Sequence, residues 1–171
     1  MPEKILSDIH RYWLDCRGQR LMPSRADIDP ADIPQLLPYL LLTDLLDDGR
    51  YRFRLVGTEV ERSFGAPMTG RTLEELMSGD YLAFMRSLYR KVIAEKRAIY
   101  STSRYSGADG DSPLFTKRVM MPLSSDGLVV DMVISAQVFL RVSALDDRTA
   151  QALLRSVGYE SEDEENLQAV T

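Results

Sequence analysis

Residues 51–71, YRFRLVGTEVERSFGAPMTGR, decide the fold of this chain. The stretch begins with alternating side chains, so Tyr51, Phe53 and Leu55 are expected on one face of a β-strand and the residues between them on the other. Gly57 ends this strand, and short helical segments follow it. A strand that gives way to short capped helices folds back over a sheet instead of extending it. The stretch therefore predicts the wall of a cup-shaped pocket.

Two helix starts in this region carry the pattern of a capping box. Thr58 is followed three residues later by Glu61, and Thr72 is followed at the same spacing by Glu75. Both threonines are therefore predicted to be helix N-caps. Gly70, in the turn just before the second cap, is predicted to have a positive φ.

The order of the remaining elements indicates the fold class. An apolar run at 39–46 predicts a buried strand, and Asp-Asp-Gly at 47–49 predicts a hairpin that joins it to the strand at 51–57. The later predicted elements are a helix at 80–96 and strands at 98–106, 113–123 and 128–141. Two strands, then helices, then three strands do not form the strand–helix alternation of a parallel sheet. The order predicts an α+β fold with five antiparallel strands.

Segments on both sides of this unit are expected to be accessory. Residues 1–18 predict a helix with an apolar stripe, to which Ile5, Ile9, Tyr12, Trp13 and Cys16 belong. The stripe fits two arrangements equally well: packing on the chain's own domain, or the seam of a dimer. The predicted division is a flanking helix at 1–18, a domain at 19–142, a helix at 143–158 and an acidic disordered tail at 159–171.

Composition limits the classes of function. The chain has 171 residues and 44% hydrophobic residues, which suits one globular domain with appendages, and it has no apolar run long enough to span a bilayer. Its single cysteine excludes an internal disulfide and fits the reducing cytoplasm. The net charge of −5 equals the five acids after residue 159, so residues 1–159 sum to zero. A neutral domain with an acidic tail is not expected to bind nucleic acid.

Several short motifs, in order, resemble one protein family. These are Arg-Leu-Val-Gly-Thr at 54–58, Phe-Gly at 64–65 and Thr-Gly-Arg at 69–71. Upstream motifs of the same kind are Pro-Ser-Arg at 23–25, Asp-Pro at 29–30, Ile-Pro at 33–34 and Leu-Leu-Pro at 36–38. Over residues 10–142 the chain resembles the bacterial family of small stand-alone PAS-domain proteins. The resemblance implies a five-stranded antiparallel sheet with helices on one face, and a role in sensing or connecting.

Residues for catalysis or metal binding are few. His10 is the only histidine and is predicted to be a solvated surface residue, and Cys16 is the only cysteine. Together they cannot supply a zinc site or a nucleophile–base pair. The resemblance implies that haem would need a histidine in the pocket region, and a covalent flavin a cysteine on the pocket helix. No catalytic residue, no metal site and no cofactor are therefore predicted.

The predicted cup leaves two alternatives, a fully packed core and a cavity for a small ligand. Its candidate residues are Phe53, Leu55, Phe64, Leu73, Tyr81, Phe84, Met85, Leu88, Val119, Met121, Met132 and Ile134. Arg54, Arg104 and Arg118 alternate with apolar neighbours in the predicted strands. Two of them could converge on a carboxylate or phosphate ligand, or they could flank the outer face of the sheet and pair with acids.

The sequence as a whole predicts a cytoplasmic, bacterial PAS-like sensory or adaptor module in signal transduction, without catalytic activity. Its signal would leave through contacts with a protein partner or with a second copy in a homodimer. The candidate contact residues are Ile5, Ile9, Tyr12 and Trp13. The main alternative is a small-molecule-binding enzyme or carrier that uses the same cup. A second alternative is a purely structural dimer with a solid core.

Overall fold

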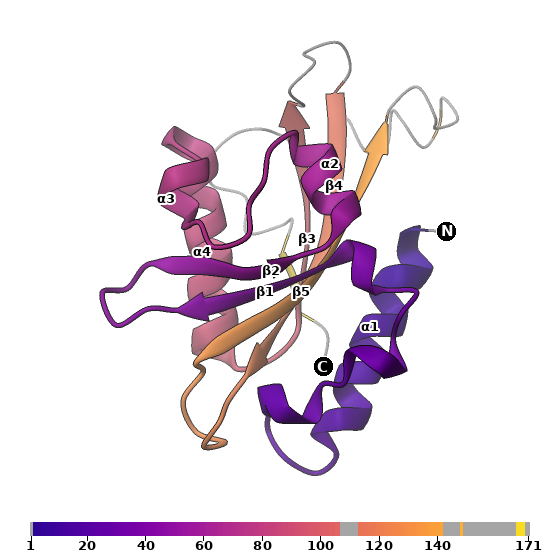
Figure 1. The fold of residues 1–171 in the computed structure, drawn as a ribbon, viewed down its shortest axis with the longest axis vertical. Coiled ribbons are helices and arrows are strands. Elements are labelled where there is room, and N and C mark those ends of the chain that lie inside the picture. The colour runs from indigo at the N-terminus through magenta and orange to yellow at the C-terminus, as the bar shows by residue number, and fades with distance from the viewer. Residues whose placement is uncertain (1, 107–112, 142–147, 149–166, 170–171) are drawn as a thin grey trace.

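A computed structural model describes residues 2–106, 113–141, 148 and 167–169. An antiparallel sheet forms the middle of the molecule, with α1 on one face and α2, α3 and α4 on the other (Figure 1). The helices are α1 (Pro2–Arg17), α2 (Thr58–Phe64), α3 (Leu73–Leu76) and α4 (Gly79–Glu95), with short 3₁₀ turns at Arg25–Asp27, Pro30–Asp32 and Leu37–Tyr39. The strands are β1 (Leu40–Leu45), β2 (Tyr51–Val56), β3 (Ile99–Ser106), β4 (Pro113–Leu123), β5 (Met132–Arg141) and β6 (Leu167–Ala169).

The strand order across the sheet is β2-β1-β5-β4-β3-β6, and every neighbouring pair is antiparallel. The predicted α+β fold with five antiparallel strands is therefore confirmed. The short β6 adds a sixth strand beside Ile99–Ser101, in a part of the sequence that was assigned to the tail. The helix predicted at 143–158 lies, apart from Arg148, outside the described residues.

A β-bulge in β2 changes which side chains face the helices α2–α4. Leu42 pairs with Leu55, but the next residue of β1, Thr43, pairs with Phe53, so Arg54 is an extra residue between them. Two residues opposite one break the period-2 alternation. Phe53 therefore faces α4 together with Thr43, whereas Leu55 shares the opposite face with Leu42 and is 40% exposed. The predicted common face for Phe53 and Leu55 is wrong for this reason.

Gly57 fixes where β2 turns into α2. Its N–H donates to the Leu40 carbonyl at 2.7 Å, and a Cβ added there would lie 2.3 Å from the Pro38 carbonyl oxygen. Since only glycine fits this close approach, Gly57 is the N-cap residue and Thr58 is the first helical residue. The prediction that Thr58 caps the helix is therefore wrong. The Glu61 carboxylate instead accepts the backbone N–H of Met68 at 2.9 Å.

The second helix start agrees with the sequence. Thr72 is the N-cap of α3, and the Glu75 carboxylate accepts its backbone N–H at 2.7 Å and its hydroxyl at 3.1 Å. Gly70 has a φ of 86°, as predicted, and donates its N–H to the Phe53 carbonyl at 2.6 Å. The turn before α3 is thus bonded directly to β2, which holds the wall of the cup over the sheet.

Helix α1 packs on the chain's own sheet. Ile9 and Trp13 are fully buried, and the Trp13 indole N–H donates to the Pro122 carbonyl at 2.9 Å. This contact ties α1 to the end of β4. Of the two arrangements that the apolar stripe allowed, the structure uses Ile9 and Trp13 for packing within the chain.

The two capping patterns give a matched pair of variants. Thr72→Ala should lower the free energy of unfolding by ~1 kcal/mol because the capping box is lost. Thr58→Ala should change it by less than ~0.5 kcal/mol, since this exposed side chain caps nothing. Urea unfolding followed by Trp13 fluorescence measures both. Equal losses in the two variants would contradict the assignment of Gly57 as the cap.

Candidate functional site

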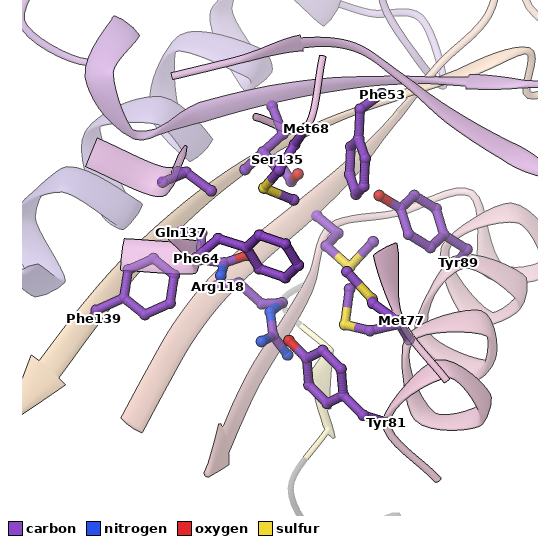
Figure 2. A pocket seen from close by; sticks show the side chains of 14 residues that line it. Phe53, Phe64, Met68, Met77, Tyr81, Tyr89, Arg118, Ser135, Gln137 and Phe139 are labelled. Atoms are coloured by element: carbon purple, nitrogen blue, oxygen red, sulfur yellow. The ribbon is translucent and has the colours of Figure 1, made fainter. Parts of the chain in front are cut away.

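The candidate site is a cup between the α2–α4 side of the sheet and these helices (Figure 2). Its side chains come mainly from β1, β2, β4 and β5, from α2 and α4, and from the segments around α3. The residues that line it are Leu41, Phe53, Val60, Phe64, Met68, Met77, Tyr81, Met85, Tyr89, Arg118, Met120, Ser135, Gln137 and Phe139.

The cup is only partly filled. Free space between its side chains, including the part that is open to solvent, amounts to about 430 Å³. The centre of a water-sized sphere can move through only about 20 Å³ of this space, which is close to the room that a single water needs. Four of the lining side chains are methionines, which change shape at low cost. The cup in this conformation is therefore narrow, but its walls can yield to a larger occupant.

One side of the cup is held in place by two tyrosines of different elements. The Tyr89 hydroxyl, from α4, forms a 2.8 Å hydrogen bond with the Thr43 hydroxyl of β1. The Tyr51 ring stacks on the Tyr89 ring at a centroid distance of 4.6 Å. Burial raises the pKa of Tyr89 far above its ordinary value, so the phenol is neutral. These contacts fasten α4 to the β1–β2 pair.

Among the described residues that line the cup, Arg118 is the only charged one, and it is 1% exposed. Its terminal nitrogens donate to the hydroxyls of Ser101 at 3.3 Å and Ser103 at 3.0 Å, and the guanidinium carbon lies 5.8 Å from the centre of the Phe84 ring. Desolvation by burial lowers the pKa of Arg118, and a hydrogen bond with Tyr81 works against this shift. A guanidinium stays protonated in proteins, so the cup contains a buried positive charge.

The surroundings of Arg118 do not satisfy all of its donors. Among the described residues its Nε has no hydrogen-bond partner, and no carboxylate forms an ion pair with it. Arg54 instead lies on the outer face, where it pairs with Asp44 at 3.2 Å, and Arg104 is exposed. The three arginines therefore do not converge as a pair, and of the three only Arg118 lines the cup.

The structure brings together four of the predicted pocket residues, namely Phe53, Phe64, Tyr81 and Met85. Leu73 and Leu88 are fully buried nearby without lining the cup, and Phe84 contacts Arg118. Four predicted strand residues, Val119, Met121, Met132 and Ile134, are buried but absent from the lining. In β4 and β5 they alternate with the residues that face the cup, so they occupy the α1 side.

The missed residues include the polar ones. β4 and β5 are buried on both faces, and their more apolar set faces α1, whereas Arg118, Ser135 and Gln137 face the cup. The prediction took the more apolar residues of each strand as the pocket lining, and these residues face α1 and not the cup. The signal in the sequence that could have indicated the cup side is the set of polar side chains in the middle of these otherwise apolar strands. The other missed lining residues are Leu41, Val60, Met68, Met77, Tyr89, Met120 and Phe139.

The histidine and the cysteine both lie on α1, away from the cup. His10, on α1, is 9% exposed and forms a 3.2 Å hydrogen bond through Nδ1 with the Tyr100 hydroxyl, so the prediction of a solvated histidine is wrong. Helix α1 turns this side chain toward β3, where the Tyr100 ring meets it edge-on. Cys16 is also on α1, across the sheet from the cup, and cannot form a flavin adduct there. Within the described ranges, no three metal-binding side chains gather at one place.

A sequence profile of the PAS domain family matches residues 1–134. The match spans most of the chain, and the chain therefore belongs to the PAS domain family. This confirms the family resemblance of its motifs. No curated protein matches the chain. None of the described helices combines the length and apolarity that crossing a membrane requires.

Solved structures share this fold at low sequence identity. Vibrio cholerae VqmA, a dimer, gives a TM-score of 0.53 at 18% identity over 71% of this chain and 61% of its own. VqmA bound to DPO gives a TM-score of 0.52 at 20% identity, over 64% of this chain and 55% of its own. A Rhodobacter sphaeroides LOV protein gives a TM-score of 0.46 at 18% identity, over 80% of this chain and 68% of its own. The chain thus spans little more than half the length of the two VqmA chains, and the likeness shows the fold alone.

The buried histidine predicts a pH dependence of stability. Desolvation, helped by the Arg17 charge, lowers the pKa of His10 from its ordinary 6.5, so the unfolded chain binds the proton more readily than the folded one. Stability should therefore fall as the pH drops below about 6.5. Urea midpoints at pH 7.5 and pH 5.5 should differ more for the wild type than for His10→Gln. Equal differences in both proteins would show that His10 does not titrate in this way.

Proposed function

We propose that this chain is a sensory or adaptor module of bacterial, cytoplasmic signal transduction that binds a small ligand in the cup and acts through protein contacts. The observation that carries the proposal is the cup: a narrow space with adaptable methionine walls and one buried, incompletely paired cation. Polar groups buried in a packed core normally have hydrogen-bond partners, so the unpaired Nε–H of Arg118 favours a binding cup over a purely structural core.

The lining of the cup argues against the enzyme alternative. General acid–base catalysis needs a group that titrates near neutral pH. The described lining residues include no histidine, cysteine or carboxylate, and the titratable groups among them are two tyrosines and Arg118. Neither residue type exchanges protons readily near neutrality. We therefore propose binding without turnover, and no cofactor other than the ligand itself.

A structural neighbour supports a ligand in this fold. One of the solved VqmA structures is described as bound to DPO, and another as a complex with ligand and DNA. DNA belongs to those longer chains, of which this chain spans 55% and 61%. The zero net charge of residues 1–159 offers no electrostatic attraction for phosphates, so we propose a protein partner and no nucleic acid.

A route for the signal leads from the cup through the sheet to α1. β4 carries Arg118 on the cup side and Val119 on the opposite side, and the Trp13 indole bonds to Pro122 of the same strand. A ligand that shifts β4 would therefore also shift the surface on which α1 packs. The outward side of α1 carries Leu14, which is 38% exposed, while Ile5 and Tyr12 are half-buried. We propose this side as the contact with a partner or a second copy.

Native mass spectrometry of freshly purified full-length protein tests the proposal. A non-covalent small molecule should be released from the wild type on denaturation, and the same spectra report the dimer. Val60→Phe places extra volume in the lining of the cup and should reduce the bound fraction at least tenfold. Val129→Phe makes the same change at a residue that is 63% exposed and should leave the bound fraction unchanged.

A compound that is retained equally by wild type and Val60→Phe would place the ligand outside the cup and contradict the proposal. So would a wild-type protein that carries no compound and whose cup methionines respond to no added small molecule. If the protein stays monomeric at every concentration, self-association is no longer part of the proposed function.

A further inference from the structure

Arg118, which lines the cup, has unused hydrogen-bonding capacity. A guanidinium carries five N–H donors in a plane. The serine hydroxyls of β3 accept from the two terminal nitrogens, and Tyr81 provides one further hydrogen bond. The Nε–H is buried and has no partner among the described residues. Figure 2 shows the guanidinium beside the Tyr81 hydroxyl, with the Phe64 ring nearby.

All described partners of this charge are neutral. Removing a cation from water is costly, and neutral hydroxyls compensate only part of the loss. Every ion pair formed elsewhere in the described chain uses other cations, for example Arg86 with Glu74 at the edge of α4 and Arg52 with Asp44 on the outer face. A buried guanidinium without a carboxylate that lines a cavity is therefore suited to an anion that enters from solution.

The other polar groups of the cup can also donate. The Gln137 side chain has an amide NH₂, and Ser135 and Tyr81 have hydroxyls, whereas no carboxylate that would repel an anion is among the lining residues that the structure describes. The rest of the wall is apolar and includes Phe53 and Phe64. A ligand that fits this wall has one charged end and an apolar body.

We propose that the cup takes a small apolar monocarboxylate, an aromatic or short aliphatic acid, whose carboxylate binds the Arg118 guanidinium through its free Nε edge. The proposal rests on the ligand-binding function proposed above. One positive charge among the described lining residues selects a monoanion, since a second negative charge would find no further cation among them. The narrow free space requires the methionines Met68, Met77, Met85 and Met120 to move aside as the apolar body enters.

The competing interpretation is that Arg118 is purely structural, bridging the strands through its serines and packing on Phe84. This interpretation accounts for the terminal nitrogens but not for the buried Nε–H. The two interpretations differ in one measurable respect. Only the anion site makes the affinity of the cup depend on the charge of the ligand.

The test uses full-length protein with ¹³C-methyl-labelled methionines, which report occupancy of the cup. Benzoate, phenylacetate, indole-3-acetate and hexanoate are each compared with the corresponding primary amide, a neutral analogue of similar shape, and phenyl phosphate serves as a dianion. At least one acid should shift the cup methyl resonances with an affinity at least tenfold above that of its amide. Phenyl phosphate should bind more weakly than phenylacetate.

Three variants assign the effect to the guanidinium. Arg118→Met removes the charge while keeping a long side chain and should abolish the preference for acid over amide. Arg118→Lys keeps the charge without the planar fork and should retain only part of the preference. Arg54→Met removes an arginine of the outer face and should bind the acids like the wild type. Circular dichroism and the methyl spectra establish that each variant is folded before titration.

The outcomes separate the two proposals. Amides that bind as tightly as their acids, or an unchanged acid preference in folded Arg118→Met, would overturn the anion site and leave a ligand-binding cup. The same conclusion would follow if the compound released in native mass spectrometry were neutral. If neither acids nor amides shift the cup methyls, and the purified protein carries no compound, both proposals fail.

Discussion

The buried positive charge on the cup side of β4 constrains the rest of the site. Arg118 lies in the middle of β4 at 1% exposure, and the surrounding side chains must accept its hydrogen bonds without competing for space. Ser101 and Ser103 do so from β3, and Phe84 supplies a ring face from α4. Small hydroxyl side chains on β3 leave room for the long arginine, so the strand pair and the helix together form a cradle for the guanidinium.

The sheet can hold such a group because its opposite face is sealed by α1. With Ile9 and Trp13 fully buried, the α1 side of β4 and β5 forms a buried apolar layer that includes Val119, Met121 and Ile134. The stability supplied by this layer allows the cup side to remain incompletely packed. The apolar layer thus lies on one face of the sheet and the proposed binding cup on the other, and the central strands β4 and β5 contribute side chains to both.

The sequence predicted the order of elements, the antiparallel sheet and the capping box at Thr72, because these depend on local patterns. It failed where tertiary contacts decided the outcome. The close approach of Gly57 to Pro38 moved the helix start by one residue, and the bulge at Arg54 turned Leu55 away from α4. In strands buried on both faces, alternation of apolar residues cannot tell which face meets a helix and which a cavity. Arg118 alternates with apolar neighbours in the sequence, but its burial depends on tertiary contacts that the sequence does not show.

The most direct test of the account is a nitrogen-detected or ¹H–¹⁵N spectrum of the Arg118 Nε–H, assigned by its loss in Arg118→Lys. A charged guanidinium should give a resolved Nε–H signal. On saturation with the best-binding carboxylate it should move downfield, exchange more slowly with solvent and show a nuclear Overhauser effect to the ligand. A Nε–H signal that stays unchanged while the cup methionines report a bound carboxylate would contradict the account.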